Sequence, residues 1–466
     1  MNDVATKPSN KRPASFYFCS ISFTFERMAY YSAKWLLYIY LTTAIIDGGL
    51  GISNGEAAIL QANLVAYTYL APVFGGYIAD RFIGAKYLIP LGAFIMAIGY
   101  YVGSVGESVG MINLMIILVS IGTGFFKGNL SAITGQLFKD KKELDAAFST
   151  QYSFVNIGSF IGTTIISFIV FNMFNTGKIG GFSEGFLFAA IICFICGVWF
   201  IFGWRFLGDA GKRPFKETEE ISVDKDKKDT VKKPLTKLEK KRVLAIILIS
   251  FFSVIFWLFW YMSYLSVYDY MAKFIQTQVG SVNVPTSWFD SLNGLWCIVL
   301  GPILGILWMK LAARPQGDMS LFKKLGIGLL FLGSSYLMLI AAEFQRGIGA
   351  GEDAKASMIW IVLFSILLSL GEMFFSPLGN SFISKYSPKR ILSVMMGVWI
   401  IASFLAGKGY GYMYAFVLKF DMMQAYVGIP IVLIVAAALL FIFNKKLITL
   451  VEGNEEDLEA HEAAGE

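Results

Sequence analysis

Histidine is nearly absent from this sequence. The only one among 466 residues is His461, in an acidic stretch at the carboxyl end, which excludes a histidine proton relay or a histidine metal site in the rest of the chain. Cysteine is scarce as well. The four cysteines lie in apolar segments, which indicates packing rather than disulfides, redox chemistry or metal binding. No nucleophile–base pair or metal cluster is evident. We therefore expect no catalytic residue, no cofactor and no enzymatic activity.

Charged residues are also few. They make up 15% of the chain, and hydrophobic residues make up 56%, whereas soluble proteins average about 25% and about 45–50%. Apolar runs recur from end to end, each long enough to cross about 30 Å of hydrocarbon. The formal net charge of +6 comes from lysines and arginines between these runs, so nucleic acid is not an expected partner. The composition predicts an all-α protein that crosses the lipid bilayer several times.

The chain contains twelve hydrophobic spans in two groups of six. They cover residues 15–46, 57–79, 87–105, 111–138, 149–173 and 184–206, then 243–275, 286–310, 322–344, 357–384, 391–418 and 424–444. Lysine and arginine are concentrated in alternate loops, which predicts that both termini are cytoplasmic. The expected domains are a cytoplasmic N-terminus (1–14), an N-terminal six-helix bundle (15–206), a cytoplasmic linker (207–242), a C-terminal six-helix bundle (243–445) and a cytoplasmic acidic tail (446–466).

This layout resembles the major facilitator superfamily fold, in which two six-helix bundles are related by a pseudo-twofold axis. The segment GGYIADRFIGAK (75–86), between the second and third spans, resembles the loop signature of that superfamily. The matching positions are Gly76, Asp80, Arg81, Gly84 and Lys86. A generic charged turn is the alternative interpretation of this segment.

Several ionisable residues lie away from the ends of the spans, where a charge costs a few kcal/mol unless a cavity or a partner compensates it. They are Glu26, Arg27, Lys34, Lys127, Glu372 and Lys408. Glu372 in the second bundle and Lys127 in the first could pair across a central cavity and close it. For Asp269 and Lys273, near the end of their span, we expect the side chains to extend to the membrane interface.

The segment FTFERMAYYSAKW (23–35) concentrates polar groups on one side of a helix. At about 100° per residue, they fall within about 140° of each other around the helix axis. The group comprises Glu26, Tyr30, Phe23, Lys34, Arg27 and Tyr31. One interpretation is a structural network of ion pairs, and the other, which we favour, is one wall of a wet substrate cavity.

Further motifs resemble the proton-coupled oligopeptide transporter family of the major facilitator superfamily, over nearly the whole chain. ERMAYYSAKW resembles its ExxER pattern with the aromatic residues that follow, and GTGFFKGN resembles GTGxFKPN. YSFVNIGSF resembles FYxxINxGS, PTSWFDSLNGLW resembles PxSWFQSLNP, and GEMFFSPLGN resembles GExxxSPxGL. MMGVW (395–399) also fits the start of the eleventh helix.

The resemblance implies a role for particular residues. Those expected to bind substrate are Tyr30, Tyr31, Lys34, Tyr69, Lys127, Asn156, Trp257, Asn293, Glu372 and Trp399. Lys34 and Lys127 would receive the carboxylate of a peptide, and Glu372 with the two asparagines would receive its amino group. Proton coupling and gating are expected from Glu26, Arg27, Lys127 and Glu372.

Two departures from the family pattern concern acids. Phe23 occupies the position of the first glutamate of ExxER, and Tyr261 lies where the family has an acid on the seventh helix. Lys34 should therefore lack an acidic partner unless Glu26 provides one.

The expected function is alternating-access uptake of di- and tripeptides, coupled to protons in an altered way. The alternatives are an uncoupled peptide facilitator, a transporter of another small organic anion or modified peptide, and a peptide receptor. The expected partners are small peptides, protons and lipid. We expect a monomer in the bacterial cytoplasmic (inner) membrane.

Overall fold

The computed structural model describes residues 12–138, 141–174, 180–214, 235–315, 317–376, 382–383, 385–388, 391–454 and 457. Most of the predicted N-terminus, linker and acidic tail lies outside these residues. Within them the secondary structure is helical, apart from one short hairpin and one isolated β-bridge between Ile275 and Ala356.

The first half begins with α1, which carries the polar stripe predicted from the sequence. Its elements are α1 (Ala14–Thr42), η1 (Ile45–Asp47), α2 (Asn54–Arg81), α3 (Ala85–Ser104), α4 (Val109–Gln136), α5 (Lys141–Phe168), η2 (Ile169–Met173), α6 (Phe182–Phe202) and α7 (Trp204–Leu207). Serines at the N-caps of α2 and α4 accept hydrogen bonds from the first-turn backbone, which fixes where these helices begin.

The second half begins with the long helix α9, which starts in a capping box formed by Thr236 and Glu239. Its elements are α9 (Lys237–Phe274), β1 (Gln278–Val279), β2 (Val282–Asn283), α10 (Trp288–Ala312), α11 (Leu321–Arg346), α12 (Ile359–Phe375), α14 (Leu392–Val417), α15 (Met422–Ile442) and α16 (Asn444–Glu452).

Each predicted hydrophobic span corresponds to a helix, with differences at the ends. α12 ends at Phe375, earlier than the predicted residue 384, and residues 377–381 lie outside the described residues. α16 occupies the start of the predicted tail. Among the described residues, ten helices are long and apolar enough to cross a membrane. α12 is apolar but shorter, and α1, with its three charges, is not among the ten.

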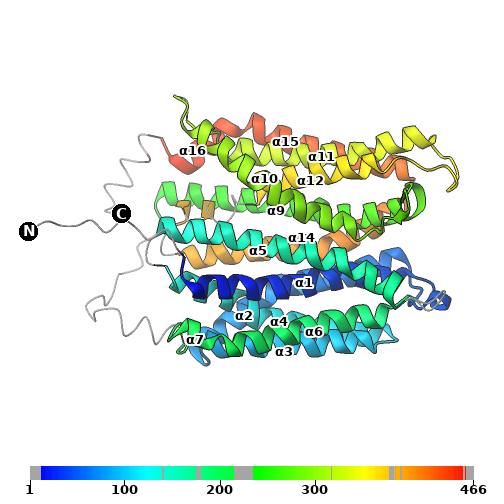
Figure 1. Ribbon diagram of the computed structural model, residues 1–466. Coiled ribbons are helices and arrows are strands. Elements are labelled where there is room, and N and C mark those ends of the chain that lie inside the picture. The colour runs from blue at the N-terminus through cyan, green and yellow to red at the C-terminus, as the bar shows by residue number, and fades with distance from the viewer. Residues whose placement is uncertain are drawn as a thin grey trace, which may run out of the picture.

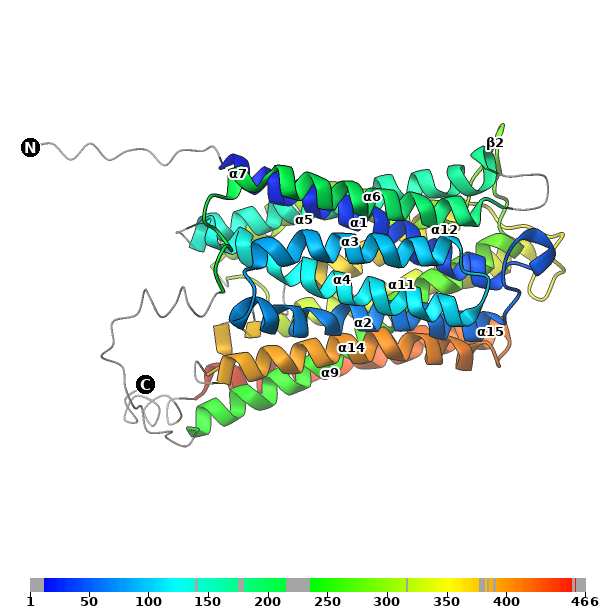
Figure 2. The same ribbon diagram turned by 90° about the horizontal axis from the view of Figure 1, so that it is seen from below.

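The long helices lie side by side along one direction (Figure 1). α1 begins at one end of this bundle, where α7 and α16 also lie, and we call this the near end. The hairpin β1–β2 lies at the opposite, far end (Figure 2). The two halves meet where α2 packs against α14 and α5 packs against α10. A cavity between the halves would therefore be walled mainly by α1, α2, α5 and their counterparts.

α1 and α5 approach each other closely through two glycines. A Cβ atom added at Gly158 would lie 2.4 Å from the carbonyl oxygen of Thr24, and one added at Gly162 would lie 2.4 Å from that of Met28. Small residues four apart are the usual way for membrane helices to bring their backbones together. This contact fixes α5 on the helix that carries the polar stripe.

The substitution Gly158→Ala should therefore destabilise the protein. We expect a loss of about 1–3 kcal/mol, the usual cost of overpacking, measured as a lower midpoint of thermal unfolding in detergent. Gly135→Ala on α4 is the matched control, because an added Cβ there meets nothing within 4 Å. Equal midpoints for the two variants would contradict the packing argument.

Candidate functional site

A cavity of about 420 Å³ lies between the two halves, within the range of small-molecule sites. Seven helices contribute to it: α1, α2, α4, α5, α9, α10 and α12. The predicted substrate residues that line it are Tyr30, Tyr31, Lys34, Tyr69, Lys127, Asn156, Trp257, Asn293 and Glu372. Trp399 on α14 is not among the lining residues and instead packs against the core. The lining also includes Thr68, Ser131, Gln151, Tyr152, Ser159 and Ser376, which had not been singled out in the sequence.

The polar stripe of α1 forms one wall of this cavity. Phe23, Arg27, Tyr30, Tyr31 and Lys34 line it, whereas Glu26 does not. The ring of Phe23 meets the ring of Phe126 edge to face, with centroids 6.1 Å apart. The position where the family has an acid is thus part of an aromatic contact.

Glu26 is bound to its neighbour Arg27. Two hydrogen bonds of 2.5 Å run from the guanidinium Nε and Nη2 of Arg27 to the two carboxylate oxygens. Glu26 is 1% exposed, and the guanidinium also lies 4.6 Å from the ring centroid of Tyr30. Because arginine stays charged in proteins, protonating Glu26 would leave the charge of Arg27 without its acid. This geometry favours a structural role for the pair, one of the two interpretations left open by the sequence.

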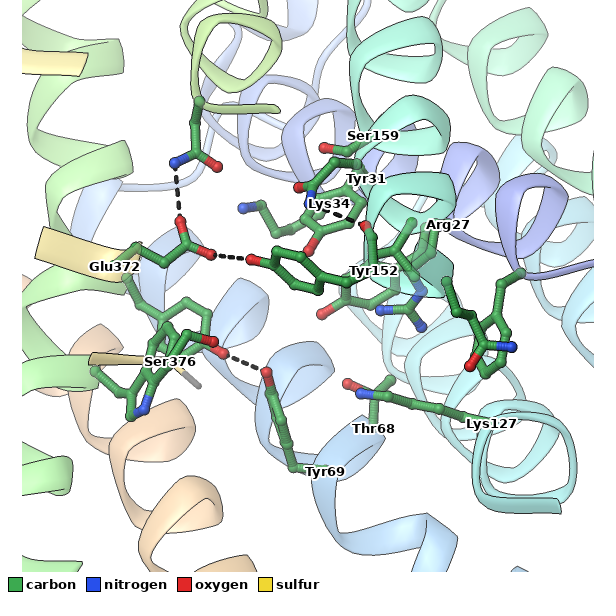
Figure 3. Close-up of a pocket in the computed structure, with 18 of the residues that line it drawn as sticks. Arg27, Tyr31, Lys34, Thr68, Tyr69, Lys127, Tyr152, Ser159, Glu372 and Ser376 are labelled. Atoms are coloured by element: carbon green, nitrogen blue, oxygen red, sulfur yellow. Dashed lines mark hydrogen bonds between the residues drawn. The ribbon is translucent and has the colours of Figure 1, made fainter. Parts of the chain in front are cut away.

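Glu372 lies on the opposite wall and accepts hydrogen bonds from neighbouring helices, including a weak one from the Cys297 thiol at 3.7 Å. Tyr152 Oη on α5 donates to one carboxylate oxygen and Asn293 Nδ2 on α10 donates to the other, both at 2.9 Å. The expected pairing of Glu372 with Lys127 is not formed. Lys127 Nζ lies 4.8 Å from the ring centroid of Tyr69 instead, and Figure 3 shows the two charged side chains on different sides of the cavity.

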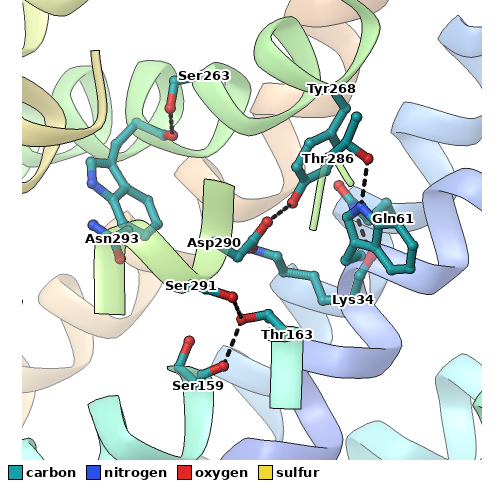
Figure 4. A network of polar contacts seen from close by, with 12 residues as sticks. Lys34, Gln61, Ser159, Thr163, Ser263, Tyr268, Thr286, Asp290, Ser291 and Asn293 are labelled. Atoms are coloured by element: carbon teal, nitrogen blue, oxygen red, sulfur yellow. Dashed lines mark hydrogen bonds and ion pairs between the residues drawn. The ribbon is translucent and has the colours of Figure 1, made fainter. Parts of the chain in front are cut away.

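Lys34 has an acidic partner that the sequence interpretation missed. Its Nζ lies 3.3 Å from Asp290 Oδ1 on α10, and both side chains are nearly inaccessible. Tyr268 on α9 donates a hydrogen bond to the other carboxylate oxygen, as Figure 4 shows. The expectation that Lys34 depends on Glu26 for a partner was therefore wrong. Asp290 lies in the first turn of α10, where an acid is ordinary because of the helix dipole, and so it attracted no attention in the sequence.

Asp269 on α9 connects the two halves at a level close to the far end. It accepts hydrogen bonds from Tyr38 Oη at 2.9 Å, from Asn54 Nδ2 at 2.7 Å and from Tyr414 Oη. The expectation that this side chain extends to the membrane interface was wrong.

Other contacts between the halves lie at neighbouring levels. Trp35 donates to Thr286, Tyr410 donates to Gln61, and Lys408 contacts Asn63. Lys408, one of the ionisable residues away from the ends of the spans, thus has a partner in the first half. The halves are held together from the level of the cavity to the far end.

Sequence comparison assigns the chain to a family of transporters. The pattern of the Major Facilitator Superfamily matches residues 22–409. The chain belongs to this superfamily. It is a multi-pass membrane transporter and not an enzyme.

Relatives of this superfamily member align with most of its length. The "Uncharacterized transporter YclF" of Bacillus subtilis (strain 168) is 26% identical over 422 residues, which cover 81% of this chain and 82% of the relative. The "Di-/tripeptide transporter" of Lactococcus lactis subsp. cremoris is 25% identical over 435 residues, which cover 81% and 84%.

The fold is also found in solved structures of transporters. A structure of the peptide transporter POT in complex with sulfate has a TM-score of 0.83 at 23% identity and covers 96% of this chain and 97% of its own. A POT family transporter in complex with 5-aminolevulinic acid has a TM-score of 0.82 at 24% identity, with 93% and 97% covered.

The loop signature of this major facilitator protein has specific contacts. A Cβ at Gly84 would lie 2.3 Å from the carbonyl oxygen of Lys212, and Lys86 Nζ donates to the carbonyl of Gly208 at 2.7 Å. Arg81 donates to Tyr77 Oη at 3.1 Å. Asp80 is the last residue but one of α2, and Gly76 meets open space. The loop thus binds the segment that follows α7 at the near end.

Proposed function

We propose that this protein takes up di- and tripeptides by alternating access, driven by protons through an altered coupling site. In this proposal twelve helices, α1 and α12 included, cross the bacterial cytoplasmic membrane. Both termini, and therefore the near end, are cytoplasmic, and the protein acts as a monomer. Positive-inside placement of lysine and arginine supports the orientation.

The separation of charge across the cavity is the observation that carries this proposal. Lys127 lies on the first half, and Glu372, with the amide of Asn293, lies on the second. A short peptide is a zwitterion whose carboxylate and amino group would be bound by these opposite walls. A substrate with both charges therefore fits the site better than a simple anion.

The arrangement of the halves corresponds to one state of an alternating-access cycle. Contacts such as those of Asp269 and Asp290 close the far end, whereas the cavity reaches Phe148 and Gln151 in the near part of α5. With the near end cytoplasmic, this is an inward-facing state.

The relatives' names support a peptide as substrate. Besides the Lactococcus protein, the "Dipeptide and tripeptide permease A" of Yersinia pestis is 24% identical over 440 residues. A Lys34 without an acidic partner would have favoured another organic anion as substrate, and its contact with Asp290 removes that support.

Purified protein in proteoliposomes tests the proposal. We expect a labelled dipeptide to accumulate inside when the outside is more acidic, and to exchange with unlabelled dipeptide when no gradient is applied. Exchange without accumulation would identify an uncoupled facilitator. Absence of both, for a panel of di- and tripeptides that bind, would indicate a receptor and overturn transport.

A further inference from the structure

One ion pair links the two halves directly, and it is the pair of Lys34 with Asp290. The other ion pairs with both partners among the described residues each lie within one half. Lys34 is on α1 and Asp290 is on α10, and their side chains are 4% and 2% exposed. When the far end opens, these two helices must separate, so the pair must break in every cycle.

The two oxygens of the Asp290 carboxylate are held differently. Oδ2 accepts the hydrogen bond of Tyr268, whereas Oδ1 is buried, receives no hydrogen bond and faces the ammonium group of Lys34. Because only the charge of Lys34 stabilises Oδ1, this oxygen can accept a proton once the ammonium group has moved away.

The surroundings of Asp290 contain few other charges. The titratable groups facing this pair among the described residues are Tyr31 and Tyr38 from α1, Tyr264 and Tyr268 from α9, Tyr410 from α14 and Glu372 from α12. α5 contributes only the hydroxyls of Thr163 and Thr164, which bond to the neighbouring Ser291. Protonation at this point is therefore controlled mainly by the distance to Lys34.

Lys34 has other positions available to it, unlike Arg27. Its Nζ lies 4.1 Å from the ring centroid of Tyr264 and 5.5 Å from that of Tyr31, and the residue lines the substrate cavity. A released Lys34 can therefore turn to the carboxylate of a peptide. Arg27 is bound through two atoms to the adjacent Glu26 and has no second position of this kind.

We propose that Asp290 is the proton-binding residue that couples transport, and that its ion pair with Lys34 is the lock that closes the far end. This inference rests on the proposed function. A proton from the external solution adds to Oδ1 while the far end is open, which leaves a neutral carboxyl group and frees Lys34 to bind the substrate carboxylate. After the halves close and the peptide leaves on the near side, Lys34 returns to Asp290. The proton is then released into the near-side cavity.

The transport experiment uses Asp290→Asn and, as a second uncharged variant, Asp290→Ser. We expect both to keep dipeptide exchange without a gradient and to lose accumulation driven by an acidic exterior, whereas Asp290→Glu retains accumulation. Asp318→Asn is the matched control, because Asp318 forms a partly exposed ion pair with Lys324 within the second half and this variant should accumulate dipeptide like the wild type. Proton-driven accumulation by Asp290→Asn or Asp290→Ser would overturn the proposal.

A measurement without substrate separates this inference from the proposed function. Spin labels at Ile46→Cys in η1 and Val279→Cys in β1 report the separation of the halves at the far end, and both sites are exposed while the four native cysteines are buried. In the wild type, lowering the pH should shift the population toward longer distances. In Asp290→Asn the longer distances should be populated at every pH. A pH response that is the same in both proteins would overturn the lock, whether or not any peptide is transported.

Discussion

Glu372→Gln should weaken the binding of an unmodified dipeptide by roughly 10- to 150-fold, since a hydrogen bond to a charged group contributes about 1.5–3 kcal/mol. Glu372 is 7% exposed, and its carboxylate is already oriented by Tyr152 and Asn293. Glutamine keeps the shape of the side chain and one acceptor oxygen but removes the charge that the peptide ammonium group requires. Isothermal titration calorimetry in detergent measures the change in Kd.

An N-acetylated dipeptide, tested on the wild type and on Glu372→Gln, completes a thermodynamic cycle for this prediction. It has no ammonium group, so its affinity should be nearly the same for the wild type and for Glu372→Gln. Ser376→Ala, which changes another lining residue without changing charge, is the control for a general disturbance of the cavity. If the two peptides lose affinity equally, Glu372 does not bind the amino group.

Glu26→Gln should destabilise the protein by about 3–5 kcal/mol, the cost of breaking a buried ion pair by removing one partner. The cause is Arg27, which stays charged and would keep its guanidinium buried without an acid. The measurement is the free energy of unfolding in mixed micelles.

The double variant Glu26→Gln/Arg27→Gln tests the cause. Because both charges are then absent, it should recover much of the stability lost by Glu26→Gln alone. A double variant less stable than the single one would show that the two side chains stabilise the helix independently. A Glu26→Gln protein as stable as the wild type would restore Glu26 as a candidate for reversible protonation.

The sequence predicted those parts of the site that depend on one helix. The placement of Arg27, Tyr30, Tyr31 and Lys34 on one face of α1 follows from the helical repeat alone, and they do line the cavity. The hydrophobic spans followed from hydropathy in the same way. Their ends were less certain, because hydropathy extended the span of α12 to residue 384, whereas the helix ends at Phe375, two residues before Pro377.

The pairings between helices could not be predicted from the sequence. Asp290 meets Lys34, and Glu372 meets Tyr152 rather than Lys127, because these choices depend on how the halves are docked. The same holds for Asp269, whose three donors come from α1, α2 and α14. Trp399 fits a family motif but lies outside the cavity lining, since a motif places a residue on a helix without fixing what it faces.

The glycine contact between α1 and α5 affects which contacts of a substrate change during transport. Since the two backbones touch at Gly158 and Gly162, the side chains that these helices present to the cavity form a single fixed surface. Bonds from a peptide to this surface can persist through a whole turnover, whereas those to α9, α10 and α12 in the other half must be exchanged. The carboxyl end of a peptide would then keep its contacts with the first half, while its amino end exchanges its contacts with the second half. Chemical changes at the amino end should therefore alter the rate of turnover as well as the affinity.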